Sequence, residues 1–126
     1  MNCRPIERDL WAAELDSFSR QHEGWLVSVK RRASDGTIAI EAHDVPLQGV
    51  SPVSHELNDV AIRVGDAHSG LTHDIHDVTA MNVELTADRA ERALIIDAKD
   101  GSTTVIEFRS PMRAEQVDGL PAPRRA

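Results

Sequence analysis

The 126-residue sequence predicts an α+β fold, in which one N-terminal amphipathic helix packs on a curled, mainly antiparallel sheet of five to seven strands. Apolar residues follow a helical period only near the N-terminus, and most of the chain after Gly24 alternates with a period of two. Asp-Gly pairs separate some of the alternating runs, as in hairpins. The alternation gives each strand a polar face, and so many strands in a short chain are expected to curl into a barrel-like shape.

The helix is expected over residues 9–22, where Trp11, Leu15 and Phe18 recur at positions i, i+4 and i+7. Asp9 is the expected N-cap, because its carboxylate can accept hydrogen bonds from free backbone N–H groups. An aromatic stripe at this spacing is typical of a core contact rather than of a cofactor site. We therefore expect the stripe to lie buried against the sheet.

The strands are expected where valine and isoleucine alternate with polar residues. Asp35-Gly36 and Asp100-Gly101 mark two hairpins, because such pairs tolerate the positive φ that tight turns demand. One face of the sheet should carry an apolar residue from most strands and form the core with the helix stripe. The expected members are Trp25, Val27, Ile38, Ile40, Val60, Ile62, Val83, Ile106 and Phe108.

The chain is expected to form a single domain over residues 1–110, followed by an extended tail over residues 111–126. A domain of this size buries roughly two-thirds of the surface that its unfolded chain exposes. The tail is expected because it contains three prolines and no apolar period.

Composition excludes several classes of partner. A net charge of −7 argues against nucleic acid, because phosphate binding requires a basic surface. The sequence lacks an apolar run near the roughly 20 residues of a membrane span, and it lacks the apolar core of a signal peptide after Met1. Cys3 is the only cysteine and cannot form an internal disulfide. These features indicate a cytoplasmic protein without a nucleic-acid or membrane partner.

The stretch HSGLTHDIHD, residues 68–77, holds three of the six histidines. If it binds a metal, the candidate ligands are His68, His73 and His76, with His43 from another strand. On a strand, however, His73 and His76 point to opposite faces and cannot chelate one ion together. We therefore expect the polar end of a strand, with His73 partly buried on the same face as Ile75.

Catalytic patterns are weak in this sequence. Glu41 and His43 lie two residues apart on the expected polar face of one strand, where an acid–base pair could form. Carboxylate–histidine neighbours are common on solvated sheets, and the sequence has no nucleophile elbow, phosphate loop or Cys-x-x-Cys motif. This pattern disfavours an enzyme and implies no cofactor.

The expected function is therefore a non-enzymatic module that binds a protein partner or itself as a homodimer. An edge strand offers one route to association. Arg113, Arg124 and Arg125 of the tail offer a basic contact for an acidic partner. The alternative is a small-molecule-binding protein or metal-dependent enzyme that uses the histidine-rich strand end.

Three segments together resemble the bacterial domain-of-unknown-function family 5335, and the similarity runs over nearly the whole chain. They are DLWAAELDSFSRQHEGWLVSV (9–29), GLTHDI (70–75) and DGSTTVIEFRSP (100–111). The resemblance implies a small single-domain protein and assigns no activity, cofactor or catalytic residue.

The family pattern Thr-His-x-Ile fits Thr72, His73 and Ile75. It then has proline where this chain has Val78, and it has no histidine at the position of His76. The resemblance therefore argues against a shared metal site built on His76.

Overall fold

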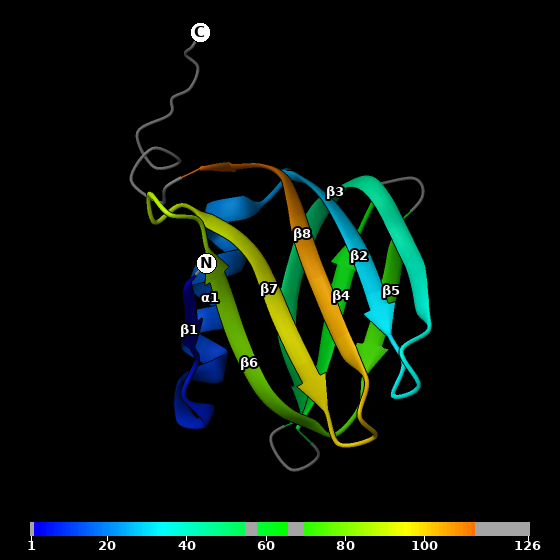
Figure 1. Ribbon diagram of the computed structural model, residues 1–126. Coiled ribbons are helices and arrows are strands. Elements are labelled where there is room, and N and C mark those ends of the chain that lie inside the picture. The colour runs from blue at the N-terminus through cyan, green and yellow to red at the C-terminus, as the bar shows by residue number, and fades with distance from the viewer. Residues whose placement is uncertain (1, 55–57, 66–69, 113–126) are drawn as a thin grey trace, which may run out of the picture.

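The computed structural model describes residues 2–54, 58–65 and 70–112. This part of the chain forms one 3₁₀ turn, one α-helix and eight β-strands (Figure 1). In chain order the elements are β1 (Asn2–Pro5), η1 (Arg8–Leu10), α1 (Trp11–His22), β2 (Leu26–Arg32), β3 (Ile38–Ser54), β4 (Asp59–Val64), β5 (Leu71–Ile75), β6 (Val78–Leu85), β7 (Glu91–Ala98) and β8 (Thr103–Met112).

The strands form one antiparallel sheet in the order β1-β6-β7-β8-β2-β3-β4-β5, with β1 and β5 at its two edges. The α+β class with one N-terminal helix and an antiparallel sheet is confirmed. The expected count of five to seven strands is wrong, because the sheet has eight, and the sheet is not closed into a barrel. β1 escaped prediction because its four residues are too short to show alternation.

β3 is the longest strand and makes the sheet curl. Its first part pairs with β2 and its second part pairs with β4, so the strand passes from one region of the sheet to the other. Figure 1 shows the result, with β4 and β5 lying behind β2 and β8. The strand β3 continues as far as Ser54.

The helix stripe is buried as expected. Trp11, Leu15 and Phe18 are at most 6% exposed, and α1 lies against β3. The expected N-cap is wrong. Leu10 occupies that position without a side-chain cap hydrogen bond, and Asp9 belongs to the preceding 3₁₀ turn.

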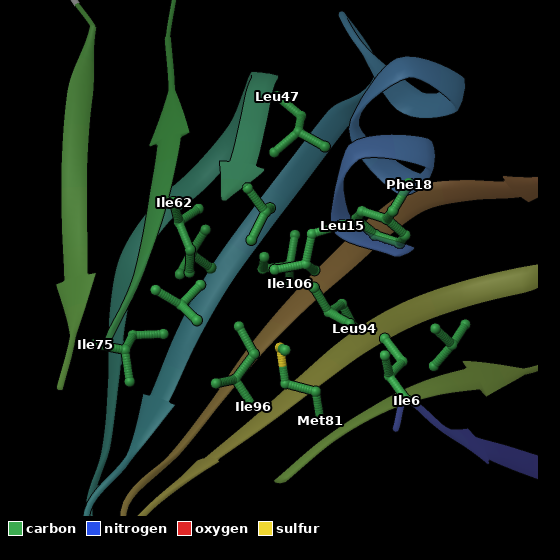
Figure 2. Close-up of a cluster of buried hydrophobic side chains, with 14 of the residues drawn as sticks. Ile6, Leu15, Phe18, Leu47, Ile62, Ile75, Met81, Leu94, Ile96 and Ile106 are labelled. Atoms are coloured by element: carbon green, nitrogen blue, oxygen red, sulfur yellow. The ribbon is translucent and has the colours of Figure 1, made fainter. Parts of the chain in front are cut away.

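One hydrophobic core fills the space between α1 and the curled sheet. We call the sheet face that carries this core the inner face. Figure 2 shows core side chains from α1 and from both regions of the sheet converging on this space. Its largest fully buried apolar members are Leu15, Leu47, Ile62, Met81, Leu94, Ile96, Ile106, Val27, Val29, Val50 and Val60.

Two isoleucines expected in the core are on the outside. Ile38 and Ile40 are each 64% exposed. Consecutive residues of β2 pair with Ile40 and Ala42, which leaves Glu41 as an extra residue in β3. Such a β-bulge shifts the in–out alternation by one residue, so both isoleucines fall on the outer face. Trp25 is also less buried than expected, and packs at the margin of the core.

The two Asp-Gly turns are confirmed, with Gly36 at φ +92° and Gly101 at φ +89°. β8 extends through Met112, two residues into the expected tail, and residues 113–126 lie outside the described residues together with the tail arginines. Within the described ranges, the structure has no helix of the length and apolar character needed to cross a membrane.

Candidate functional site

A pocket of about 390 Å³ lies between β5 and the adjacent ends of β2, β7 and β8. We call it the strand-end pocket. Its volume falls within the range of roughly 300–1,000 Å³ that is usual for small-molecule sites. It is lined by Val29, Arg31, Glu41, Thr72, His73, Asp74, Ile75, His76, Ala98, Asp100, Ser102 and Thr104.

The pocket exists because the inner face of the sheet changes from apolar to polar towards this end. On β2, buried Val29 is followed two residues later by Arg31. On β8, Ile106 is buried in the core, while Thr104 comes next on the same face, and Ser102 follows it just before the strand begins. Side chains two apart on a strand share a face, so these polar groups occupy positions where further apolar residues would extend the core.

Glu41 lines the pocket because of the β3 bulge. In a regular strand its carboxylate would point away from the core, on the face opposite to Ala42. As the extra residue of the bulge, Glu41 lies with Ala42 opposite Val29 of β2, whose side chain is fully buried on the inner face. A bulge of this kind commonly re-aims a side chain beside a functional site.

His73 reaches the pocket from β5. It pairs with buried Ile62 of β4, which places it on the inner face. Its side chain is 22% exposed, so it is partly buried on the face of Ile75, as expected. His73 Nδ1 lies 3.9 Å from Glu41 Oε1, beyond hydrogen-bonding distance. His73 Nε2 is buried and has no hydrogen-bond partner among the described residues.

Arg31 is held at the rim of the pocket by the turn between β7 and β8. Its Nη2 lies 3.3 Å from Asp100 Oδ2 and 3.4 Å from Ser102 Oγ. Hydrogen bonds from the Ser102 hydroxyl and backbone N–H lower the pKa of Asp100, and the Arg31 charge lowers it further. The Arg31 guanidinium and the Asp100 carboxylate therefore form an ion pair.

The three metal candidates that the structure describes, His43, His73 and His76, contact different neighbours. His76 follows β5 and its Nδ1 lies 3.0 Å from Asp59 Oδ2, while His73 faces Glu41. His43 Nδ1 lies 3.2 Å from Ser28 Oγ. His68 is outside the described residues.

Within residues 2–54, 58–65 and 70–112, the structure has no group of three His, Cys, Asp or Glu side chains placed to hold a metal ion. Glu41 and His43, which the sequence offered as a possible acid–base pair and disfavoured, do not form an ion pair or hydrogen bond with each other among the described residues. Each side chain contacts a different neighbour: Glu41 lies near His73, and His43 lies near Ser28.

The histidine–aspartate contact at His76 is electrostatically favourable. The hydrogen bond with Asp59 and its negative charge raise the pKa of His76 above its usual value. The same hydrogen bond, together with one from the Asp77 backbone N–H, lowers the pKa of Asp59. The imidazole of His76 is exposed and Asp59 is partly buried, so this pair is a contact near the surface, at the pocket margin.

A second polar cluster lies under α1 and was missed by the sequence analysis. His22 is fully buried, with Nδ1 2.7 Å from the Phe18 carbonyl oxygen and Nε2 3.3 Å from Glu91 Oε1. The imidazole stacks on Phe108 at 4.4 Å between ring centroids. Burial raises the pKa of Glu91 above its usual value. The signal was present, because His22 lies one helical repeat beyond Phe18 and so continues the buried stripe.

Comparison with known proteins identifies the family of this chain. Neither a curated protein nor a solved structure matches it. Residues 2–117 match the family of unknown function DUF5335, which spans most of the 126 residues. The match covers every described element, including all the strands that line the strand-end pocket. The chain therefore belongs to the DUF5335 family of unknown function.

Proposed function

We propose that the protein binds a small polar molecule in the strand-end pocket. The observation that carries this proposal is the placement of charged groups on the inner face of the sheet, with Glu41 turned inward by the bulge and His73 Nε2 buried without a partner among the described residues. Buried polar atoms without partners cost free energy. Proteins tolerate such costs mainly at functional sites.

The proposed role is binding rather than proton-transfer catalysis. His73 Nδ1 and Glu41 Oε1 are 3.9 Å apart, so the carboxylate does not hold the imidazole by a hydrogen bond. The side chain of Arg31 is engaged by Asp100 and Ser102 at the rim. This arrangement supports a site that orients a ligand by a few polar contacts within a partly apolar wall.

A panel of small polar molecules tests this proposal, with binding followed through backbone amide chemical shifts in NMR spectra. Ligands should shift the amides of Arg31, Glu41, His73 and Ser102 together. The Thr104→Leu variant, which replaces a buried pocket hydroxyl with a larger apolar side chain, should lose these responses. Shifts that are scattered over the surface, or that persist in Thr104→Leu, would contradict the proposal.

Self-association is a second candidate function, supported by the outward isoleucines. Ile38 and Ile40 are each 64% exposed, and β5 is an edge strand with Leu71 57% exposed. Edge strands and exposed apolar residues both favour association between chains.

Light scattering at tens of micromolar protein in physiological salt tests this second candidate. A homodimer is expected for the parent, and Ile40→Lys should shift it towards monomer by placing a charge on the association surface. Glu84→Lys, a charge change on another strand, is the control. A monomeric parent would contradict self-association and leave the pocket proposal standing.

A further inference from the structure

We propose that the strand-end pocket selects a small molecule with a single positively charged head group, an ammonium or guanidinium, which binds against the carboxylate of Glu41. This inference rests on the binding role proposed above and specifies its ligand class. The inference follows from a contrast between two charged residues of the pocket. Arg31 has an acidic partner, whereas Glu41 has a histidine as its basic neighbour.

The positive charge of the pocket is already neutralised. Arg31 Nη2 lies 3.3 Å from Asp100 Oδ2, and Ser102 Oγ lies 3.4 Å from the same nitrogen. Asp100 is in turn fixed by hydrogen bonds to the backbone N–H and hydroxyl of Ser102, at 2.9 and 2.6 Å. An anionic ligand would have to compete with this carboxylate for the guanidinium.

The negative charge of Glu41 is not neutralised in the same way. The basic group that the structure places near it is the His73 imidazole, whose Nδ1 lies 3.9 Å from Glu41 Oε1. An imidazole balances a carboxylate only while it carries a second proton. A ligand cation would therefore supply the missing counter-charge.

The other titratable groups around the pocket do not oppose this preference. Asp74 borders the pocket but alternates with His73 and Ile75, which places its side chain on the outer face, and His76 is engaged by Asp59 at 3.0 Å. The whole chain carries a net charge of −7, which attracts cations over a longer range. The charges of Arg31 and Asp100 offset each other. The carboxylate of Glu41 therefore gives the pocket a net negative charge.

The size and walls of the pocket limit the rest of the ligand. A volume of about 390 Å³ accommodates a head group with a short carbon chain. Val29, Ile75 and Ala98 provide apolar wall for that chain, while the hydroxyls of Ser102 and Thr104 lie at the same end. A single cation on a short, partly polar chain satisfies these surfaces better than a large aromatic ligand does.

Three probes of equal chain length separate charge from shape: aminopentanol as the cation, pentanediol as the neutral form and hydroxypentanoate as the anion. Their affinities are measured by NMR titration of the parent, Glu41→Gln, Arg31→Met and the control Glu84→Gln, whose carboxylate lies outside the pocket. Aminopentanol should bind the parent most tightly. Glu41→Gln should weaken its binding roughly tenfold, since it removes the opposite charge that lines the pocket.

The Arg31→Met variant decides between the two signs of charge. It removes the positive group and frees Asp100, so it should preserve or strengthen aminopentanol binding, while Glu84→Gln should change nothing. Tighter binding of hydroxypentanoate in the same pocket, lost in Arg31→Met, would overturn the cation inference while supporting the binding role. Failure of aminopentanol to shift the pocket amides would also overturn the inference, and the broader panel of polar molecules would then decide the binding role separately.

Discussion

The contact between His76, which is exposed, and Asp59, which is partly buried, reports on the fold at the margin of the pocket. Their contact at 3.0 Å joins the residue after β5 to the first residue of β4. Since neighbouring antiparallel strands fix this approach, the contact depends on the β4–β5 pairing. Its electrostatic consequences can therefore be measured as a test of that pairing.

The pKa of His76 is expected to lie above the ordinary imidazole value of 6.5, because Asp59 accepts its hydrogen bond and stabilises its charged form. NMR titration of the imidazole protons measures this value. Asp59→Asn should lower the titration midpoint towards 6.5. Equal midpoints in the parent and the variant would contradict the contact.

The pair should also make stability depend on pH in a defined direction. The raised pKa of His76 adds stability that is full below about pH 6.5 and is lost as the pH rises through the folded-state value. The lowered pKa of Asp59 adds stability that is full above about pH 3.8 and is lost as the pH falls. The contribution of the pair is thus greatest between these limits.

His73 should illustrate a conflict between stability and function. Its buried Nε2 has no hydrogen-bond partner among the described residues, so His73→Leu should raise the free energy of unfolding by about 1 kcal/mol. His76→Ala, a surface change, should stay within about 0.5 kcal/mol of the parent. Chemical denaturation measures both. Destabilisation by His73→Leu would indicate that Nε2 is well partnered in the folded protein.

At the scale of elements, three hairpin turns share one backbone pattern. In each, the N–H of the first residue donates to the carbonyl of the fifth, and the N–H of the fourth donates back to the first. The fourth residue has positive φ: it is Gly36 in the β2–β3 turn, Gly101 in the β7–β8 turn and Arg89 in the β6–β7 turn. The sequence revealed the two turns with glycine and gave no signal for the third.

Arg89→Gly should therefore stabilise the β6–β7 turn. Arg89 adopts φ +71°, a conformation that costs a residue with a Cβ about 1–2 kcal/mol. Glycine removes that cost but loses more entropy on folding, so the net gain in unfolding free energy should be about 0.5 kcal/mol. Arg89→Ala keeps the Cβ and should bring no gain. A melting temperature lowered by Arg89→Gly would contradict the turn geometry.

Phe18 joins α1 to the sheet through aromatic packing. Its side chain is 5% exposed and stacks on Phe108 of β8 with ring centroids 5.6 Å apart. Phe18→Ala should lower the free energy of unfolding by about 3–5 kcal/mol through lost burial and a cavity. Ser17→Ala, exposed on the same helix, is the control. An unchanged denaturation midpoint for Phe18→Ala would contradict this packing.

Sequence patterns predicted the helix and two of the turns well, because each of these features depends on residues that are close together in the sequence. The helix stripe and the two Asp-Gly turns are of this kind. The inner face of β3 was not predictable, because a single extra residue at Glu41 reverses the alternation and has no signature in composition. The wrong placement of Ile38 and Ile40 follows from that one residue.

At the scale of the whole molecule, the sheet is an open, curled surface rather than a closed barrel. The edge strands and the strand-end pocket depend on pairing between strands that are far apart in the sequence. Local sequence patterns do not predict such pairing. The contact of His73 with Glu41 joins residues 32 positions apart, and His22 meets Glu91 across 69 positions. Sequence patterns could therefore single out His73 without identifying Glu41 as its neighbour, and they did not single out His22.

The folded protein is expected to be stable without a bound metal. Within the described ranges, no group of three His, Cys, Asp or Glu side chains is placed to hold a metal ion. The melting temperature of metal-loaded and chelator-treated protein should therefore agree, as measured by circular dichroism. A chelator-sensitive parent whose sensitivity disappears in both His73→Ala and His76→Ala would reverse this expectation.

The β3 bulge has a consequence for how this sequence can evolve. Val29 of β2 pairs with Ala42 of β3 across the β2–β3 hairpin. The number of residues between them therefore determines which side chains of the hairpin face the pocket. Substitutions in this segment alter single side chains, but a one-residue gain or loss can exchange the two faces of a strand. Relatives that keep the same pocket should therefore vary freely in residue type across this hairpin while holding its length constant.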